Sequence, residues 1–163
     1  VYRHPKSTVA EACRAVRTNL LFMSPDRPLR TILVTSSGPR EGKSTTVIAT
    51  GIAMAQSGGR VLLVDTDMRR PRLHRAMGVP NDKGVSSVLV GDATLDEVVK
   101  STEVPGLFLI PSVPIPPNPA ELFHTQAFRE FVGAISSRFE RVLFDSPPVN
   151  AVADPAVLAT QVD

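Results

Sequence analysis

Four short apolar runs, separated by segments that suit helices, constrain the fold of this chain most strongly. The runs are residues 30–35, 61–64, 107–110 and 141–144. Each is rich in aliphatic or β-branched residues, a pattern typical of strands that are buried on both faces. Because such strands alternate with helices along the chain, the sequence predicts an α/β fold with a mostly parallel sheet and helices on both of its faces.

The segments between these strands carry helix and loop signals. Residues 5–22 have apolar side chains at three- and four-residue steps, and Ser7 or Thr8 can cap the start of that helix. Further helical patterns cover residues 44–57, 85–90, 94–99 and 127–139. Residues 111–119 contain five prolines and predict a loop, because proline donates no backbone hydrogen bond. The chain stops at Asp163 after a last helix-like stretch, so we expect further strands of the sheet beyond it.

The composition is that of an ordinary globular protein and argues against several other classes. Hydrophobic residues make up 42% of the 163 residues, charged residues 21%, and the formal net charge is only +2. This small charge, together with 5% aromatic residues, argues against a nucleic-acid partner, which needs basic patches or stacking platforms. The single cysteine, Cys13, favours a reducing compartment, and no apolar run reaches the roughly 18–20 residues of a membrane span. We expect one soluble, intracellular domain.

A phosphate-binding loop lies directly between the first predicted strand and the helix that follows it. Residues 36–45 contain the sequence Gly-Lys-Ser at Gly42, Lys43 and Ser44. In such loops the glycine lets backbone N–H groups approach the phosphates, the lysine reaches the β- and γ-phosphates, and the hydroxyl can bind Mg²⁺. Ser37 stands where the usual pattern begins with glycine, but the strand–loop–helix setting supports the assignment. The candidate nucleotide-binding residues are Gly38, Pro39, Arg40, Glu41, Gly42, Lys43, Ser44 and Thr45.

Three aspartates follow predicted strands at the edge of the sheet where α/β proteins bind ligands. Asp65 and Asp67 come after the strand at 61–64, and Asp145 follows the strand at 141–144. Alternate residues of an extended segment share a side, so we expect Asp65 and Asp67 to address one metal–phosphate centre. In proteins with a phosphate-binding loop, an aspartate placed like Asp145 usually holds Mg²⁺. The candidate metal ligands are Ser44, Asp67 and Asp145.

These motifs resemble those of the cytoplasmic domain of the bacterial tyrosine kinases (BY-kinases). The resemblance extends, in order, along nearly the whole chain. This family is associated with capsule and exopolysaccharide export. The similar segments are 39–45 (Walker A), 65–71 (Walker A′), 144–148 (Walker B), 11–17 (the pattern E-x-x-R-x-x-R) and 115–122 (a further family segment). The resemblance implies a P-loop NTPase-like fold and a kinase domain over residues 1–163 that is truncated at its C-terminus.

The resemblance also implies a reaction, the transfer of a phosphoryl group from ATP to protein tyrosine with Mg²⁺ as the metal ion. A base must then take the phenol proton, and the family pattern implies Asp65 as the first candidate and Asp67 as the second. Lys43 would stabilise charge on the transferred group, while Ser44 and Asp145 would position Mg²⁺. The implied catalytic residues are Lys43, Asp65, Asp67 and Asp145.

Further implications of the resemblance concern partners. The helix within residues 1–28 would form subunit contacts in a ring-like homo-oligomer. Its contact residues would be Glu11, Arg14 and Arg17. Other implied partners are protein tyrosine substrates and an inner-membrane polysaccharide co-polymerase or transmembrane activator, which places the domain in the cytoplasm at the inner membrane.

Separately from the resemblance, Arg69, Arg70, Arg72 and Arg75 form a basic cluster. It could be a solvated basic face near the anionic substrate, or one arginine could contact a nucleotide phosphate or a neighbouring subunit's acidic tail, for which Arg69 and Arg70 are the candidates.

The sequence departs from the family pattern at two points, and two other functions stay open. Arg40 stands where the family more often has glycine, and the family's C-terminal tyrosine cluster is absent from this sequence. Related partitioning and septum-positioning ATPases carry a signature lysine where Gly38 stands, which argues against that branch. The same loop and carboxylates would nevertheless serve an ATPase switch in which water replaces the phenol. They would also serve an assembly module in which bound nucleotide holds a ring together, and only the resemblance identifies the acceptor.

Overall fold

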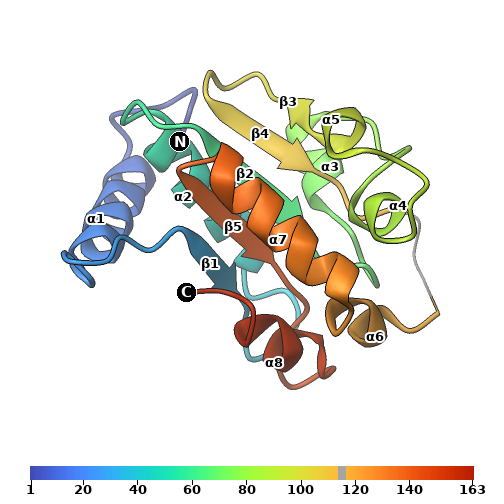
Figure 1. Ribbon diagram of the computed structural model, residues 1–163. Coiled ribbons are helices and arrows are strands. Elements are labelled where there is room, and N and C mark those ends of the chain that lie inside the picture. The colour runs from blue at the N-terminus through green and yellow to red at the C-terminus, as the bar shows by residue number, and fades with distance from the viewer. Residues whose placement is uncertain (114–116) are drawn as a thin grey trace.

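A five-stranded sheet, of which four neighbouring strands are parallel, forms the centre of the structure (Figure 1). The computed structural model describes residues 1–113 and 117–163. The strands are β1 (Thr31–Val34), β2 (Val61–Asp65), β3 (Lys100–Ser101), β4 (Leu107–Ile110) and β5 (Arg141–Asp145), in the order β1-β5-β2-β4-β3 across the sheet. The four predicted strands are confirmed as the parallel set. The sequence does not predict β3, which pairs antiparallel with β4, because two residues are too few to show a hydrophobic pattern.

Eight helices connect and cover the strands in the described part of the chain. They are α1 (Thr8–Phe22), α2 (Lys43–Ala55), α3 (Leu73–Met77), α4 (Val85–Leu89), α5 (Leu95–Val98), α6 (Pro119–Phe123), α7 (Gln126–Arg138) and α8 (Asp154–Ala159). Ser7 caps α1 as predicted, since its Oγ accepts the N–H of Ala10 at 3.2 Å. The sequence analysis misses α3 and α6, and α6 begins inside the predicted proline loop because proline is tolerated in the first turn of a helix. Residues 114–116 of that predicted loop lie outside the described residues.

The apolar strands bury alternate side chains on opposite faces of the sheet. Leu62 of β2 belongs to a cluster with Ile135 of α7, whereas its neighbour Leu63 packs in a second cluster with Val47 of α2. Figure 1 shows α7 lying across one face of the sheet and α2 behind the other. Each fully buried leucine contributes roughly 1.5–3 kcal/mol relative to an exposed one. The predicted sheet with helices on both faces is therefore confirmed.

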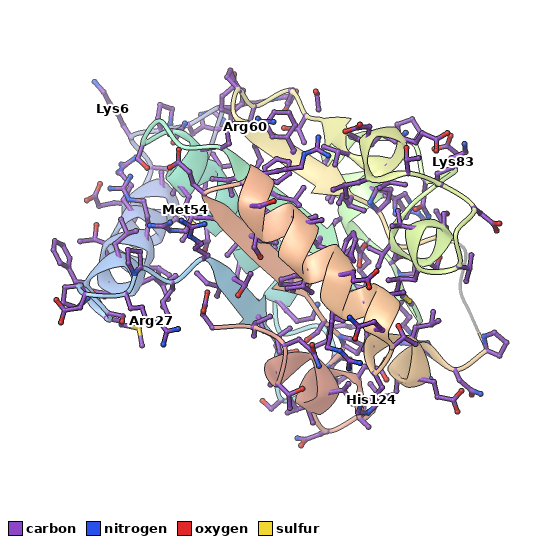
Figure 2. All side chains as sticks on the ribbon, in the orientation of Figure 1. Lys6, Arg27, Met54, Arg60, Lys83 and His124 are labelled. Atoms are coloured by element: carbon purple, nitrogen blue, oxygen red, sulfur yellow. The ribbon has the colours of Figure 1, made fainter. Side chains whose placement is uncertain are left out.

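Arg60 covers the core at the end of the sheet where β2 begins (Figure 2). Its guanidinium carbon lies 5.0 Å from the ring centroid of Phe108 and 5.1 Å from that of Phe139, within the range of cation–π contacts. The core is thus closed at the amino end of β2, opposite to the carboxyl ends of the parallel strands. Within the described ranges, no helix has both the length and the apolar character that crossing a membrane requires.

Candidate active site

The carboxyl ends of β1, β2 and β5 bring the predicted site residues together. In the register of the sheet, Asp145 at the end of β5 lies beside Val34 of β1 on one side and Asp65 of β2 on the other. The phosphate-binding loop leaves β1 and leads directly into α2 at Lys43. Ligand sites of parallel α/β sheets form at this edge, so the fold places the loop and the carboxylates where a ligand would bind.

The loop between β1 and α2 turns through two residues in the left-handed region. Gly42 has φ 80° and Arg40 has φ 64°, and Arg40 is the sole residue other than glycine with a positive φ among those the structure describes. A backbone hydrogen bond from Gly38, followed by one from the Ser37 hydroxyl at 3.1 Å, lowers the pKa of Glu41, so this carboxylate is tied back onto the loop. The left-handed conformation explains why glycine suits position 40, because glycine adopts it without a steric penalty.

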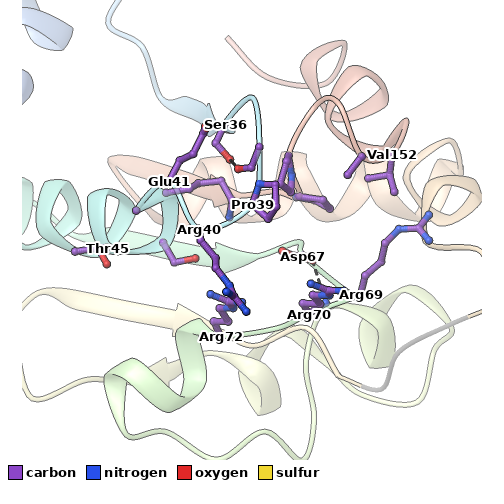
Figure 3. A pocket seen from close by; sticks show the side chains of 17 residues that line it. Ser36, Pro39, Arg40, Glu41, Thr45, Asp67, Arg69, Arg70, Arg72 and Val152 are labelled. Atoms are coloured by element: carbon purple, nitrogen blue, oxygen red, sulfur yellow. Dashed lines mark hydrogen bonds between the residues drawn. The ribbon is translucent and has the colours of Figure 1, made fainter.

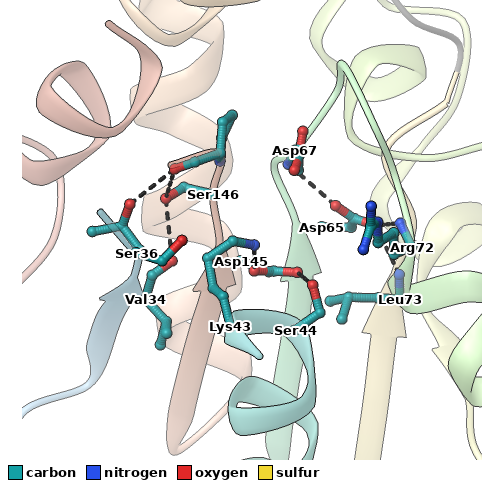
Figure 4. A network of polar contacts seen from close by, with 12 residues as sticks. Val34, Ser36, Lys43, Ser44, Asp65, Asp67, Arg72, Leu73, Asp145 and Ser146 are labelled. Carbon is teal, nitrogen blue, oxygen red and sulfur yellow. Dashed lines mark hydrogen bonds and ion pairs between the residues drawn. The ribbon is translucent and has the colours of Figure 1, made fainter. Parts of the chain in front are cut away.

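Lys43, Ser44 and Asp145 form one polar network at the floor of the loop (Figure 4). Lys43 Nζ pairs with Asp145 Oδ1, and Ser44 Oγ donates to Asp145 Oδ2 at 2.8 Å. The side chains of Lys43 and Asp145 are 9% and 1% exposed, so water reaches neither charge freely. Because an unpaired buried charge costs several kcal/mol, each of these two residues depends on the other.

The oxygen atoms of this network suit a magnesium ion. Mg²⁺ prefers oxygen ligands and is usually held by one or two protein side chains together with substrate phosphates and water. The Ser44 hydroxyl and the Asp145 carboxylate supply such a pair. Among the described residues, no group of three or more His, Cys, Asp and Glu side chains could hold a metal ion. A hydroxyl and a carboxylate such as Ser44 and Asp145 are the kind of protein ligands that hold Mg²⁺ together with phosphate oxygens and water.

Asp65 is buried at the end of β2, and both of its carboxylate oxygens accept backbone N–H groups. Its Oδ1 accepts from Asp67, and its Oδ2 accepts from Arg72 and Leu73, each at 3.1 Å. Because Leu73 is the first residue of α3, Asp65 satisfies backbone donors that the start of a helix leaves unpaired. Burial, followed by the nearby charge of Asp145, raises the pKa of Asp65 to about 7. Asp65 thus holds the connection between β2 and α3 in shape.

Asp67 is half-buried and lines a cavity that Asp65 does not reach. Its Oδ1 accepts the N–H of Arg70 at 3.0 Å, and burial raises its pKa. The next residue, Met68, is fully buried in the core, which fixes the backbone after β2. The expectation that both aspartates address one centre stays a prediction. In the structure Asp65 accepts the backbone N–H groups of Arg72 and Leu73, whereas Asp67 lines the cavity. Asp67 is the one with access to a bound molecule.

A cavity of about 390 Å³ lies over the loop and the strand ends (Figure 3), a size suited to a small molecule. All eight predicted nucleotide-binding residues line it, as do Asp67, Arg69 and Arg70. Six further lining residues are not among the predicted site residues, although Pro147 and Pro148 belong to the segment similar to Walker B: Ser36, Arg72, Pro147, Pro148, Ala151 and Val152. Val149 donates its N–H to Ser36 O at 2.9 Å, which brings the segment after β5 against the loop.

Arg69 is anchored at the cavity by a residue that the sequence analysis misses. Its Nε and Nη2 donate to the carboxylate of Asp154 at 3.2 and 3.3 Å, and the Asp154 side chain is 0% exposed. Asp154 starts α8, where a carboxylate is favoured by the helix dipole. The Asp-Pro pair at the start of a helix is a local signal for this position, but its partner lies 85 residues earlier. The sequence pattern therefore does not indicate the pair.

The three residues predicted for subunit contacts make contacts within the chain. Arg14 Nη2 pairs with Glu11 at 2.7 Å and also donates to Pro5 O at 2.8 Å. Arg17 Nη1 donates to Ala53 O of α2 at 3.2 Å, and its Nε is buried without a hydrogen-bond partner. Arg17 therefore lies on the side of α1 that packs against α2, and the subunit contact stays a prediction.

Comparison with known proteins identifies the family. The sequence matches a family described as AAA domain over residues 30–161. The tyrosine-protein kinase YwqD of Bacillus subtilis is 39% identical over 98% of this chain and 67% of its own length. The chimerical protein CapA2B2 superposes with a TM-score of 0.96 at 38% identity, over 99% of this chain and 71% of that one. The kinase domain of the Escherichia coli tyrosine kinase ETK gives 0.92 at 32% identity, over 97% and 62%.

The chain belongs to the bacterial tyrosine kinases. The family, the P-loop NTPase-like fold and the kinase class expected from the sequence are therefore confirmed. The relatives also favour the kinase interpretation over the ATPase switch. This tyrosine-kinase domain spans about two thirds of the length of YwqD.

Proposed function

We propose that this tyrosine-kinase domain binds ATP and Mg²⁺ at the carboxyl ends of β1, β2 and β5 and transfers the γ-phosphoryl group to a protein tyrosine. The observation that carries the proposal is the buried network of Lys43, Ser44 and Asp145 below a phosphate-binding loop, with Asp67 facing the same cavity. Family membership supports the choice of tyrosine as the acceptor.

The phosphates would bind in the loop that leads into α2. Backbone N–H groups and the amino-terminal end of this 13-residue helix favour negative charge there. Lys43 would leave Asp145 for the β- and γ-phosphates, and Ser44 and Asp145 would hold Mg²⁺. When bound, the metal ion neutralises charge that develops on the phosphate oxygens. These residues would position the γ-phosphoryl group and stabilise its transfer.

The acceptor phenol must lose a proton, because its ordinary pKa is about 10. As the phenol oxygen forms a bond to the γ-phosphorus, the bond from that phosphorus to the β–γ bridging oxygen breaks and ADP leaves. The phenol proton passes to a carboxylate. We assign this role to Asp67, because it faces the cavity, in preference to Asp65, whose oxygens both accept backbone N–H groups. The geometry thus supports the reverse of the order expected from the resemblance.

The variants Asp67→Asn and Asp65→Asn separate these two roles. We expect Asp67→Asn to lower the rate of tyrosine phosphorylation about 10²–10⁴-fold, as loss of a general base does, with an unchanged melting temperature. The new side chain keeps an oxygen that accepts the N–H of Arg70. In Asp65→Asn the amide NH₂ cannot accept, so a buried N–H loses its partner at a cost of about 1–3 kcal/mol.

At pH 4, where burial keeps the wild-type Asp65 carboxyl uncharged and the substitution removes no charge, the melting temperature of Asp65→Asn should therefore fall by several degrees, at about 2–4 °C per kcal/mol. Differential scanning calorimetry measures stability, and mass spectrometry measures phosphotyrosine. Wild-type phosphorylation rates in Asp67→Asn would refute its role as the base. A lower melting temperature in Asp67→Asn than in Asp65→Asn would refute the division of roles.

We further propose that the kinase acts in capsule or exopolysaccharide synthesis or export. It would work on the cytoplasmic side of the inner membrane with a polysaccharide co-polymerase or a transmembrane activator as its partner. Membership of the bacterial tyrosine kinases supports this proposal. Subunits of a homo-oligomer would then phosphorylate one another's tyrosines.

The outward face of α1 supports an oligomer. Val9, Val16 and Met23 are 62%, 43% and 71% exposed, and their seven-residue spacing puts them on one side of the helix. In the full-length protein we expect Val16→Glu to yield monomers by light scattering, because it places a charge in an apolar contact. Ala134→Glu on the exposed side of α7 is the control. An unchanged oligomer mass in Val16→Glu would refute this contact.

A further inference from the structure

Three arginines around the cavity have no acidic partner in the described part of the chain. Arg40 comes from the phosphate-binding loop, and Arg70 and Arg72 come from the segment between β2 and α3. All three are exposed and line the same cavity, and no ion pair joins them to a carboxylate there. By contrast, Lys43 and Arg69 are paired with Asp145 and Asp154. The carboxylates of Glu41 and Asp67 line the same cavity, but its basic side chains outnumber these two.

Arg40 occupies a backbone conformation that disfavours an arginine. Its φ of 64° lies in the left-handed region, which costs a residue with a side chain roughly 1–2 kcal/mol and glycine almost nothing. In Figure 3 its side chain extends from the loop toward Arg72. Strained residues of this kind cluster at functional sites. The loop thus holds an arginine at the cavity in a conformation that glycine would adopt more readily.

The phosphates of ATP already have partners elsewhere, in the loop amides, in Lys43 and in the magnesium-binding pair of Ser44 and Asp145. The segment that carries Arg70 and Arg72 instead surrounds Asp67, the proposed base, and the backbone N–H of Arg70 binds the Asp67 carboxylate at 3.0 Å. Residues beside an acceptor tyrosine would therefore lie near these guanidinium groups.

We propose that Arg40, Arg70 and Arg72 form an anion-binding site for acidic side chains beside the acceptor tyrosine. The inference rests on the proposed kinase function and names its preferred substrates, namely tyrosines flanked by Asp or Glu. Guanidinium groups bind carboxylates through paired N–H donors, and complementary charge raises specificity at such surfaces.

The test compares two peptides as substrates of the full-length protein with MgATP. One peptide has Glu on both sides of a single tyrosine, and the other has Gln at those positions. We expect the wild type to prefer the Glu peptide in kcat/KM, and Arg40→Gly to reduce the ratio of the two kcat/KM values about fivefold, as loss of one well-placed ion pair does. Arg40→Asn should reduce the ratio by a similar factor, because asparagine tolerates the left-handed region and carries no charge. Arg75→Ala, on α3 outside the cavity, is the matched control.

The ratio of the two kcat/KM values and the KM for ATP together separate an acceptor site from a nucleotide contact. A ratio that falls in both Arg40 variants but not in Arg75→Ala supports the acceptor site. An unchanged ratio with a raised KM for ATP would assign the guanidinium to the nucleotide and overturn the inference. Equal use of both peptides by the wild type would overturn it while leaving the kinase function intact. Phosphate release without phosphorylation of either peptide would overturn the proposed function itself.

Discussion

Replacing Lys43 with methionine is expected to lower phosphotyrosine formation at least about a thousandfold, because it removes the charge that stabilises the transferred phosphoryl group. The lysine side chain is 9% exposed, so solvent screens the charge of the transferred phosphoryl group poorly once the ammonium group is removed. Methionine retains much of the apolar stem but leaves the buried Asp145 carboxylate without its partner, so the melting temperature of the variant is measured on the same sample. Phosphotyrosine on the full-length protein, quantified by mass spectrometry after incubation with MgATP, measures the effect.

The matched control for this variant is Lys83→Met. Lys83 lies on the surface and pairs with Glu97 at 3.0 Å, and both side chains are 46% exposed. The Lys83→Met variant makes the same chemical change away from the cavity. We expect its phosphotyrosine formation to be within about twofold of the wild type, since exposed ion pairs contribute little. A Lys43→Met protein that still forms phosphotyrosine at the wild-type rate would show that Lys43 does not act on the phosphoryl group.

Gly84→Ala is expected to destabilise the fold strongly, although it adds only one methyl group and lies outside the cavity. A Cβ atom at Gly84 would lie 2.0 Å from Pro111 O, a backbone atom that cannot rotate away. The segment after β4 would have to move away from α4. In the wild type, the N–H of Val85 in the first turn of α4 donates to Pro111 O of that segment at 2.8 Å. Overpacking of this kind costs about 1–3 kcal/mol, and the broken hydrogen bonds add about 1 kcal/mol each.

We therefore expect Gly84→Ala to lose about 3 kcal/mol in the free energy of unfolding, which urea denaturation measures. Gly133→Ala is its control, because no atom lies within 4 Å of a Cβ at that position of α7. Alanine is favoured over glycine within a helix by about 1 kcal/mol, so Gly133→Ala should stabilise the protein. An unchanged free energy of unfolding in Gly84→Ala would contradict the close packing of α4 against the segment after β4.

Much of the fold follows from local sequence patterns. The phosphate-binding loop is predictable because it requires Gly42 and Lys43 between a strand and a helix, and the parallel strands are predictable because they are apolar along their length. The sequence also marks Arg40 as a departure from the family. Glycine suits position 40 because the backbone there has a positive φ, and this conformation becomes visible only in the structure.

The remaining features depend on contacts between distant parts of the chain. The short helix α3 starts where Asp65 receives the N–H groups of Arg72 and Leu73, and five residues show too little hydrophobic periodicity to reveal it. The different roles that we propose for Asp65 and Asp67 rest on the hydrogen bonds that each carboxylate makes after β2, which alternation along an extended segment does not anticipate. Arg69 and Asp154 meet only once α8 folds back beside the cavity.

The central claim is that the γ-phosphoryl group of ATP passes to a tyrosine phenol and not to water. The most direct test incubates the full-length protein with Mg²⁺ and ATP labelled in the γ-phosphoryl group. Label on tyrosine and label in inorganic phosphate are then quantified in the same reaction. We predict label on tyrosine that disappears in Lys43→Met. Release of inorganic phosphate with no label on tyrosine would contradict the kinase function and favour a nucleotide-dependent ATPase switch.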